Sequence, residues 1–394
     1  MVLHTPTSPI RRSERKHLVL LGAGHAHLQV IKQWPEFAPR YAQVTLISPD
    51  PIQLYSGMMP GWVAGRYQLN ECQIDVRPWL ERAGIHWIQD ACVGLDAGGR
   101  LLHLQDPASG PVAFDRLSID IGSSMSLAQL EASMPGAKGR VLPIRPMGLF
   151  AAHWEAAIER AKERRIDICI VGAGAAGVEL ALACKAKLKS VRAQATVTLL
   201  TGGTEHLLRQ YSRRVQDFAT QALERAGVSV LTQRCVGFED GAIVLENNLR
   251  LKSDLPIMTT GSMAPTWLGD SDLALDQRGY IEVNAHQQSS SHPHVFACGD
   301  IASRNDIEHP KSGVYAIRAG EQMADQLAAS LRGGALKEIA VQHRSLNILN
   351  TSDGRAIAAY DGWSMSGRLA QILKDYIDRR YVQSFQTLTT RTQE

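Results

Sequence analysis

Residues 165–178 read RIDICIVGAGAAGV, and this stretch decides the fold of the chain. Its three glycines follow a buried apolar run at the spacing of a tight strand-to-helix turn. Such a turn presents backbone N–H groups at the start of a helix, where the pyrophosphate of a dinucleotide binds. We therefore expect a strand over 165–171, a helix over 178–187 and a dinucleotide at the turn. The turn residues expected to contact it are Gly172, Gly174, Ala175, Ala176 and Gly177.

A second copy of this pattern lies near the start of the chain, in residues 16–27, which read KHLVLLGAGHAH. His27 replaces the third glycine, so a strand, turn and helix without a ligand is the alternative interpretation. Pro35 is expected to end the helix at Trp34. The residues of this turn expected to contact a dinucleotide are Gly22, Gly24, His25, Ala26 and His27.

The strand after each turn normally ends in a residue that selects the cofactor. After the apolar residues 43–47, Ser48 takes the place of the usual acid, and Asp50 follows two residues later. After 195–200, residues 201–203 read TGG, with neither the acid typical of NADH nor the arginine typical of NADPH sites. Ser48 is therefore a candidate cofactor contact, and the sequence leaves the choice between NADH and NADPH open.

The composition is that of a globular chain with little net charge. The 394 residues include 42 Lys and Arg against 39 Asp and Glu, a formal charge of +3, so nucleic acid is not an expected partner. The six cysteines form neither a Cys-x-x-Cys nor a Cys-x-x-x-x-Cys pair, and their spacing to histidine indicates no metal site. We expect reduced thiols, no metal and no membrane-spanning helix, in a cytoplasmic protein.

Two dinucleotide turns in one chain predict two dinucleotides, and a flavin with a nicotinamide is a pair that passes electrons. A further apolar strand, 294–298, ends in Gly299 and Asp300. A carboxylate at the carboxyl end of a strand near a nucleotide turn can accept hydrogen bonds from sugar or ribityl hydroxyls. FAD at the first turn and NAD(P)H at the second is the assignment that follows.

Short motifs outside the turns resemble the flavoprotein pyridine nucleotide oxidoreductases over nearly the whole chain. IDIG at 119–122 and TTG at 259–261 stand where that family has its crossover motifs, and ACGD at 297–300 resembles its flavin motif. Narrower matches resemble the type II NADH dehydrogenase-like group, especially the branch found fused to selenide, water dikinase. These matches are GHAH at 24–27, YSGMMPG at 55–61, DIGS at 120–123, PKSGVYAIR at 310–318 and KDYIDRR at 374–380.

The resemblance implies an α/β fold with two Rossmann-type dinucleotide-binding domains, as in glutathione reductase, and a C-terminal α+β tail. The FAD-binding domain is expected in two parts, 16–146 and 262–333. The NAD(P)H-binding domain, 147–261, is expected as an insertion between them, and 334–394 forms the C-terminal region.

The resemblance also implies roles for residues outside the turns. Glu179 is expected to face the junction of flavin and nicotinamide, with favourable electrostatics at a helix N-terminus as the alternative role. Lys311 is expected just before a helix over 313–331 whose N-terminus points at the flavin, where a cation stabilises the reduced ring. An exposed loop lysine is the alternative. Further expected cofactor contacts are Gly122, Gly261, Gly299, Asp300, Ser312 and Gly313.

These residues predict an oxidoreductase that passes hydride from NAD(P)H to FAD and electrons to an acceptor, with a quinone as the first choice. A sulfur or selenium species, another small acceptor, or a redox-responsive nucleotide-binding protein without turnover are the alternatives. Tyr315 and His309 are candidates for the proton donor. Because the redox cysteine pairs of the family's disulfide reductases do not occur in this sequence, a dithiol relay is not expected.

The tail has a helical pattern with an apolar face that must cover something. The face consists of Leu369, Ile372, Leu373, Tyr376 and Ile377, with Lys374, Asp375, Asp378 and Arg379 away from it. It is expected to pack on the domain itself, on a second subunit in a homodimer, or on a membrane. A membrane contact would place the protein peripherally on the inner face, with Arg368, Lys374, Arg379 and Arg380 near anionic lipid.

Overall fold

The computed structural model describes residues 15–39, 41–125, 127–260, 263–309, 311–341 and 344–386. The chain divides into two compact units, each assembled from three segments. Each unit contains a five-stranded parallel sheet with helices, which confirms the predicted α/β class. The first unit comprises Met1–Gln53, Asp75–Ser123 and Ala264–His343, and the second comprises Leu54–Ile74, Ser124–Met263 and Arg344–Glu394.

These compact units differ at three places from the division expected for the nucleotide-binding domains. Leu54–Ile74, residues 124–146 and Arg344–Glu394 all group with the second unit. The reason is packing: helix α2 (Met59–Val63) contacts helix α6 (Ala175–Ser190), and the tail strands contact the same helix. The predicted boundaries concern cofactor binding and stay a prediction.

The first unit is built on a parallel sheet with the strand order β19-β9-β1-β2-β5. The last four residues of its central strand are buried, because helices or further strands cover both faces of a parallel sheet. The chain moves from β1 to β2 on one side and later to β9 on the other, so the carboxyl ends of β1 and β9 flank a switch point. The strands are β1 (Lys16–Leu21), β2 (Ala42–Ile47), β5 (His86–Ile88), β9 (Arg116–Ile119) and β19 (Val295–Ala297).

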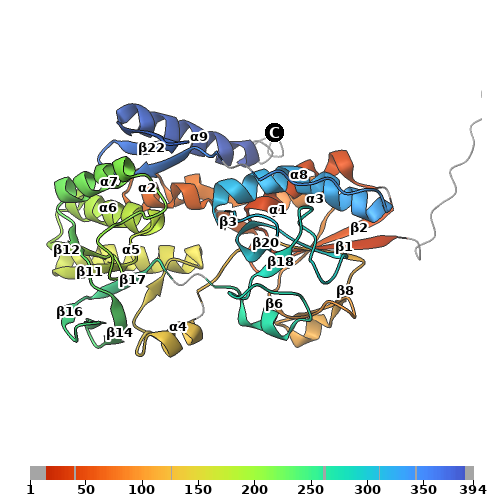
Figure 1. Cartoon of the computed structure of the whole chain (residues 1–394), viewed down its shortest axis with the longest axis horizontal. Coiled ribbons are helices and arrows are strands. Elements are labelled where there is room, and N and C mark those ends of the chain that lie inside the picture. The colour runs from red at the N-terminus through yellow and green to blue at the C-terminus, as the bar shows by residue number, and fades with distance from the viewer. Residues whose placement is uncertain are drawn as a thin grey trace, which may run out of the picture. The chain divides into compact units, whose positions relative to one another are not determined.

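Two helices, α1 (His25–Phe37) and α8 (Gly313–Arg332), pack on each other at one face of this sheet (Figure 1). A Cβ on Gly320 would lie 2.4 Å from the carbonyl oxygen of Ala26, so glycine permits the close crossing. Helix α8 was expected over 313–331 and ends one residue later.

Helix α1 continues beyond the proline that was expected to stop it. Pro35 lies inside the last turn, and the helix reaches Phe37, so the predicted end at Trp34 was wrong. A proline removes one N–H, which costs least near a helix end. The N–H of Ala38 still donates to the carbonyl oxygen of Trp34 at 2.8 Å and completes the turn. A short helix, α3 (Arg77–Ala83), packs beside α1.

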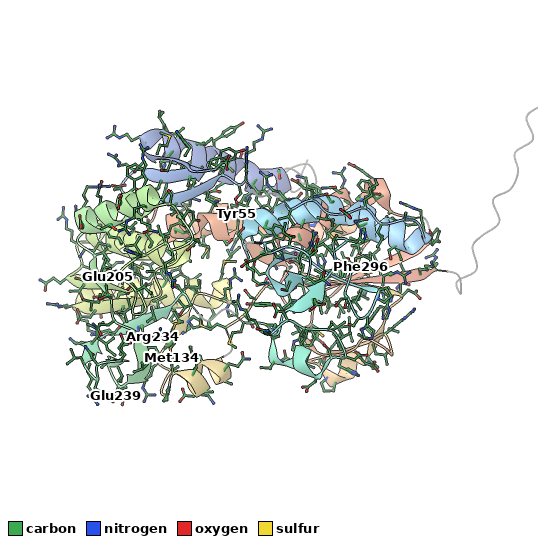
Figure 2. All side chains as sticks on the ribbon, in the orientation of Figure 1. Tyr55, Met134, Glu205, Arg234, Glu239 and Phe296 are labelled. Carbon is green, nitrogen blue, oxygen red and sulfur yellow. The ribbon has the colours of Figure 1, made fainter. Side chains whose placement is uncertain are left out.

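The sheet also packs against two smaller sheets, the antiparallel β6-β7-β8 and the parallel pair β18-β20. The apolar residues of these strands join the core formed by β1, β9 and β19. Buried Phe296 on β19, labelled in Figure 2, is among the largest side chains of the unit that have no exposed surface. The elements are β6 (Cys92–Asp96), β7 (Leu101–Leu104), β8 (Val112–Ala113), β18 (Ile281–Val283) and β20 (Ala302–Arg304).

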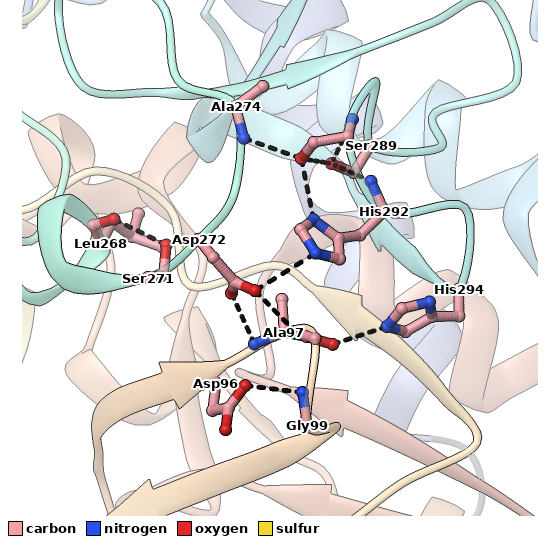
Figure 3. A network of polar contacts seen from close by, with 12 residues as sticks. Asp96, Ala97, Gly99, Leu268, Ser271, Asp272, Ala274, Ser289, His292 and His294 are labelled. Carbon is pink, nitrogen blue, oxygen red and sulfur yellow. Dashed lines mark hydrogen bonds and ion pairs between the residues drawn. The ribbon is translucent and has the colours of Figure 1, made fainter.

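A polar network joins the turn between β6 and β7 to a segment almost 200 residues later (Figure 3). Asp272 accepts hydrogen bonds from the backbone N–H groups of Ala97 at 2.7 Å and Gly98 at 2.8 Å. Its carboxylate also lies 3.2 Å from Nε2 of His292, and Nε2 of His294 donates to the carbonyl oxygen of Ala97 at 2.7 Å. These bonds hold together chain segments that are separated in sequence by much of the second unit.

The second unit repeats the plan of the first, with the parallel order β10-β17-β11-β12-β13. All six residues of β11 are buried, which confirms the strand predicted at the start of the second turn. Helix α6 starts three residues before the predicted 178 and ends three residues after 187. The strands are β10 (Leu142–Pro143), β11 (Ile166–Val171), β12 (Ala195–Leu200), β13 (Ser229–Leu231) and β17 (Leu255–Met258).

Further elements complete the second unit. An antiparallel sheet packs with α4 around the core residues Phe238 and Ile243. The tail adds another antiparallel sheet that contacts α6, α7 and α9 (Figure 1). The remaining helices are α4 (Leu127–Ser133), α5 (Met147–Glu163), α7 (Arg213–Ala226) and α9 (Arg368–Gln386). The remaining strands are β3 (Ile52–Leu54), β4 (Gln73–Asp75), β14 (Cys235–Glu239), β15 (Ala242–Leu245), β16 (Arg250–Lys252), β21 (Asn347–Asn350), β22 (Ala356–Tyr360) and β23 (Trp363–Gly367).

Helix α9 turns its apolar face to solvent and its polar face toward the second unit, whereas an amphipathic helix usually packs its apolar face on the core. Its predicted apolar face points to solvent, with Leu369 71 % exposed and Ile372 62 % exposed. Packing of this face on the domain itself is therefore wrong for the described chain. Lys374 and Asp378, expected on the polar side, are buried because they face each other and other polar side chains inside the unit.

Candidate active site

The first turn has the geometry of a dinucleotide-binding loop. Gly22 adopts a φ of +88°, which an L-residue with a side chain rarely takes, and its N–H donates to the carbonyl oxygen of Ile47 at 2.8 Å. Helix α1 starts at His25, so the backbone N–H groups of its first turn point toward the carboxyl end of the sheet. His25 and Ala26, both expected contacts, lie in that first turn.

His27 shows why the third glycine is dispensable in this turn. The side chain is fully buried, with Nδ1 2.6 Å from the carbonyl oxygen of Gly22 and Nε2 2.8 Å from the hydroxyl of Ser118. Since a carbonyl only accepts, Nδ1 donates to Gly22 and Nε2 accepts from Ser118. Burial lowers the pKa of His27 to about 4, so the ring is neutral at pH 7. The imidazole ring thus joins helix α1 to the turn and to strand β9 through two hydrogen bonds, where a glycine would allow direct backbone packing. Because both ring nitrogens are engaged, the ring has none left for a cofactor.

Asp120, the residue that follows β9, lies at the centre of the first turn, and sequence reasoning assigned it no role. Its side chain is 2 % exposed, and Oδ2 accepts the N–H of His27 at 2.8 Å. A Cβ on Gly24 would lie 2.5 Å from the carboxyl atoms, and a Cβ on Gly299 2.5 Å from Oδ1. Burial raises the pKa of Asp120 to about 7, while the N–H groups of His27 and Ala26 oppose the shift. Gly24 and Gly299 therefore make room for this carboxyl group.

The other expected FAD contacts also lie at this edge of the sheet. Ser48 directly follows β2, and its hydroxyl donates to the carbonyl oxygen of Asp50 at 3.1 Å. Gly122 follows Asp120 with a φ of +64°. Gly299 has a φ of +69° and begins the one-turn helix η6 (Gly299–Ile301), which contains Asp300. The first unit thus brings Ser48, Gly122 and Asp300 to the carboxyl ends of three different strands.

The second turn fits the roles that the three glycines play in dinucleotide-binding proteins. Gly172 has a φ of +115°, and a Cβ on Gly177 would lie 1.8 Å from its carbonyl oxygen. A Cβ on Gly174 would meet no atom within 4 Å, so the backbone is open to a ligand at this point. Ala175 and Ala176 begin helix α6. Gly261, the remaining expected contact, lies outside the described residues.

Thr259 occupies in the second unit the place that Asp120 has in the first. Gly22 follows the β1 residue paired with Ile119, and Gly172 follows the β11 residue paired with Met258. The hydroxyl of Thr259 donates to the carbonyl oxygen of Val171 at 3.0 Å or Gly172 at 3.1 Å. The two turns are therefore alike in backbone, but one contains a buried acid where the other has a neutral hydroxyl.

Glu179, in the first turns of α6, is bonded to the tail of the chain. Its Oε1 accepts the backbone N–H of Asn350 at 2.6 Å. Protein surrounds the carboxyl group on most sides, although part of the side chain reaches solvent. Burial, together with the negative charge of Asp378, raises the pKa of Glu179 to about 7, while Lys374 and the N–H of Asn350 oppose the shift.

The inner face of α9 presents polar side chains to the second unit. Nζ of Lys374 lies 3.1 Å from Oδ2 of Asp378, one helical turn further on. The hydroxyl of Tyr55, labelled in Figure 2, donates to Oδ1 of Asp378 at 3.3 Å, and its ring lies 4.7 Å from that of Tyr381. Burial and these neighbours raise the pKa of Tyr55 well above its usual value.

A second acid of α9, Asp375, accepts hydrogen bonds from Tyr67 and Arg66. Sequence reasoning missed Tyr55 and Lys374 as site residues, although both lie in motifs that carried the resemblance. The i, i+4 spacing of Lys374 and Asp378 could have indicated this ion pair. The same spacing is also common on exposed helix faces, so it does not by itself indicate a buried site.

The side chain of Lys311 is partly buried and bonded to nearby backbone. Its Nζ donates to the carbonyl oxygens of Asp300 at 2.9 Å and Ala302 at 2.8 Å, and lies 3.7 Å from the ring centre of Tyr280. Burial lowers the pKa of Lys311 to about 8. Ser312 caps α8 by accepting the N–H of Tyr315 at 3.4 Å, and Gly313 begins the helix. The alternative of an exposed loop lysine is therefore wrong.

The two candidate proton donors of α8 and the preceding loop lie together. The rings of His309 and Tyr315 stack with centres 4.2 Å apart, and the Tyr315 hydroxyl accepts from Nε2 of Gln287 at 3.2 Å. Burial raises the pKa of Tyr315. No contact in the described residues singles out either side chain as a donor.

The cysteines are free thiols, and five of the six are buried. Burial raises the pKa of Cys169 and Cys184 far above the usual value, so neither is a reactive thiolate. The described residues contain no group of three or more His, Cys, Asp or Glu arranged to hold a metal ion. Both turns present a helix N-terminus at which a dinucleotide can bind, and Gly174 leaves the backbone of the second turn open.

Fold and site together define a class of protein that binds two dinucleotides and transfers electrons between them. The pyridine nucleotide-disulphide oxidoreductase family model matches residues 16–320, which is most of the chain. The chain belongs to this family. It is an NAD(P)H-dependent flavoprotein oxidoreductase with FAD and NAD(P)H as cofactors, and the two parallel sheets are its Rossmann-type folds.

Proteins similar to this chain in sequence include members of the NADH dehydrogenase group. The NADH dehydrogenase-like protein YutJ of Bacillus subtilis is 22 % identical over 361 residues, covering 91 % of this chain and 96 % of its own. The type II NADH:quinone oxidoreductase of Staphylococcus epidermidis is 21 % identical over 393 residues, covering 94 % and 96 %. The predicted resemblance to this group is confirmed, while the narrower resemblance to the branch fused to selenide, water dikinase stays a prediction.

Solved structures show the same fold. The sulfide:quinone oxidoreductase of Aquifex aeolicus matches with a TM-score of 0.79 at 14 % identity, covering 95 % of this chain and 92 % of that one. The NDH2 of Plasmodium falciparum in complex with NADH matches with a TM-score of 0.75 at 13 % identity, covering 96 % and 98 %. Among the described helices, none is both long and apolar enough to cross a bilayer.

Proposed function

We propose that this protein is an NAD(P)H:quinone oxidoreductase in which the first turn holds FAD and the second holds NAD(P)H. The observation that carries the proposal is the pair of turns, each with a helix N-terminus at a sheet switch point. Only the second has open space beside its middle glycine, Gly174. When bound, FAD accepts a hydride from NAD(P)H and delivers two electrons to an acceptor. The quinone as acceptor is supported by two similar proteins, the NADH:quinone oxidoreductase of Staphylococcus epidermidis and the sulfide:quinone oxidoreductase of Aquifex aeolicus.

Glu179 is the residue that we assign as the proton carrier for the acceptor. A carboxyl group with a pKa of about 7 can both hold and release a proton near neutral pH. The ionisable groups that face it are Tyr211 from the loop before α7, and Lys374 and Asp378 from α9. Because Tyr55 donates to Asp378, these side chains form one polar cluster inside the second unit.

Lys311 acts as a positioning residue in this proposal. Two of its three N–H bonds hold the carbonyl oxygens of Asp300 and Ala302. These bonds fix the loop that carries Asp300, which we assign to the sugar or ribityl hydroxyls of FAD. The negative charge of Asp300 in turn partly offsets the lowering of the pKa of Lys311 by burial.

The exposed face of α9 is assigned to a membrane surface, where a quinone dissolves. Tyr376 is 58 % exposed and Trp363, on the neighbouring strand β23, is 56 % exposed, in addition to Leu369 and Ile372. An apolar face of this kind inserts into the boundary of headgroups and acyl chains. Two of the cations expected to meet lipid are otherwise engaged. Lys374 pairs with Asp378, and Arg379 pairs with Glu71 at 2.6 Å.

An anaerobic titration tests the proposed reaction. NADH and then NADPH are added to the purified protein while the flavin absorbance is recorded, and menadione follows. We expect one nucleotide to bleach the flavin bands and menadione to restore them. Bands that return with polysulfide or oxygen but not with a quinone would show another class of acceptor. Bound flavin that neither nucleotide bleaches would contradict an enzyme and favour a nucleotide-binding protein.

A further inference from the structure

The buried acid in the first turn has a consequence for how the cofactor binds. The carboxyl group of Asp120 accepts hydrogen bonds from the backbone N–H groups of His27, at 2.8 Å, and Ala26. Both N–H groups belong to the first turn of α1. Helix N-terminal amides of this kind bind the pyrophosphate of dinucleotides. A carboxylate therefore occupies donors that an anionic ligand also uses.

Among the described residues, no positively charged side chain pairs with Asp120. The ionisable groups that face it are His27 from α1, Asp300 from η6 and Cys298, which lies between β19 and η6. His27 is neutral at pH 7, Asp300 adds a like charge, and Cys298 is a buried thiol. No Lys or Arg of the described residues forms an ion pair with Asp120. An ionised Asp120 and a bound pyrophosphate would thus repel each other at short range.

The second unit provides an internal comparison. The same position beside its turn holds Thr259, whose neutral hydroxyl donates to the carbonyl oxygen of Val171, at the end of the neighbouring strand β11, or of Gly172. A dinucleotide can therefore be accommodated at such a turn without an acid, and the acid is a specific property of the first turn.

We propose that Asp120, buried beside the first turn, takes up a proton when FAD binds, so that its negative charge is removed from the neighbourhood of the phosphates. The proposal rests on the assignment of FAD to the first turn. The proton comes from solvent and adds to the carboxylate, so no other group changes its charge. It follows that FAD binds most tightly at low pH, where Asp120 is already neutral, and loses up to about tenfold in affinity per pH unit at higher pH.

Isothermal titration of the full-length apoprotein with FAD tests this inference. Measuring the enthalpy in buffers of different ionisation enthalpy at pH 6, 7 and 8 gives the number of protons bound. We expect an uptake that approaches one proton between pH 7 and 8 and falls toward zero at pH 6. The variants D120N and D120T, the second copying Thr259, should bind FAD without uptake and with an affinity that no longer varies with pH. D115N changes an aspartate at the opposite end of β9, bonded to the N–H of His17, and should behave like the wild type.

The outcomes separate this inference from the proposed function. FAD that binds to the wild type without proton uptake at any pH would overturn the role of Asp120 and leave the cofactor assignment intact. Uptake that persists unchanged in D120N and D120T would also overturn it. A failure of FAD to bind the wild type at all would overturn both. If either variant does not fold, the wild-type measurement decides by itself.

Discussion

Oε1 of Glu179 accepts a hydrogen bond of 2.6 Å from the backbone N–H of Asn350, 171 residues later in the chain. This bond joins the start of helix α6, next to the second dinucleotide turn, to strand β21 of the tail. The carboxyl group is thereby held beside Lys374 and Asp378, which are buried on the inner face of α9. Glu179, predicted from its position after the Gly-rich turn to face the junction of flavin and nicotinamide, is thus held by the C-terminal region.

Replacing Glu179 by glutamine removes the ionisable carboxyl group but keeps an oxygen that can accept the hydrogen bond from Asn350. The amide oxygen of E179Q can still accept the N–H of Asn350, so the unfolding free energy should change by less than about 1 kcal/mol. Flavin reduction by NAD(P)H should persist, whereas reoxidation by menadione at pH 7 should slow by about 10- to 100-fold. Stopped-flow absorbance measures both steps. An unchanged reoxidation rate and pH profile in E179Q would contradict the role as proton carrier.

Two glycines of the second turn make a matched pair of substitutions. In G177A the new Cβ would lie 1.8 Å from the carbonyl oxygen of Gly172, so we expect a loss of stability on the order of 3 kcal/mol. In G174A the Cβ meets no protein atom within 4 Å, so the fold should be retained. The methyl group would instead occupy the space left for the dinucleotide, and the Kd for NAD(P)H should rise at least tenfold. Thermal unfolding and nucleotide titration check the pair, and equal effects of both would contradict the assignment.

His27 should make the stability of the first unit depend on pH. Its pKa in the folded protein is about 4, against 6.5 for an ordinary histidine, so the unfolded chain binds more protons between these values. Stability from this group is present above pH 6.5 and is lost as the pH falls toward 4, by about 3 kcal/mol in total. H27A, which leaves Ser118 and the Gly22 carbonyl without their partner, should cost about 2–4 kcal/mol at pH 7.

Urea unfolding of the wild type and H27N at pH 7.5 and pH 5 isolates the contribution of His27. The difference in stability between the two proteins should shrink at pH 5, because asparagine does not titrate. A difference that stays constant with pH would show that His27 does not lose a proton on folding.

The outer face of α9 offers a test of membrane contact that leaves the folded unit unchanged. Serine at Leu369, Ile372 and Tyr376 should not lower the melting temperature, since these side chains are exposed. Sedimentation with vesicles of phosphatidylglycerol and phosphatidylcholine should fall at least tenfold. The control is L249S, which removes a leucine that is 62 % exposed in the turn after β15. A triple variant that loses a dimer in solution but still binds vesicles would assign the face to a second subunit.

Much of the fold follows directly from short sequence patterns. The two Gly-rich turns, the strands before them and the helices after them are predicted because steric limits on φ and close approach act between neighbouring residues. The same reasoning places Ser48 and Asp300 at the ends of strands.

Two features, the end of α1 at Pro35 and the orientation of the tail helix, could not be predicted from local sequence patterns. Pro35 is tolerated because only the last turn of α1 depends on it, which the sequence alone does not reveal. The apolar stripe of α9 was predicted, but the sequence left open whether it faces the domain, a second subunit or a membrane, and in the structure it faces away from the domain. That direction depends on Lys374 and Asp378 finding partners on α6 and in the segment that contains Tyr55, which are distant in sequence.

The sequence by itself determined that this chain binds two dinucleotides and belongs among the enzymes that pass electrons between them. Only the tertiary structure decided which acids lie beside the turns. Asp120 is 93 residues from His27, and Glu179 is 171 residues from Asn350, yet each pair is joined by a hydrogen bond. The physical reason is that a turn is fixed by the chain's own local geometry, whereas the pKa of a buried acid is fixed by whatever packing brings near it.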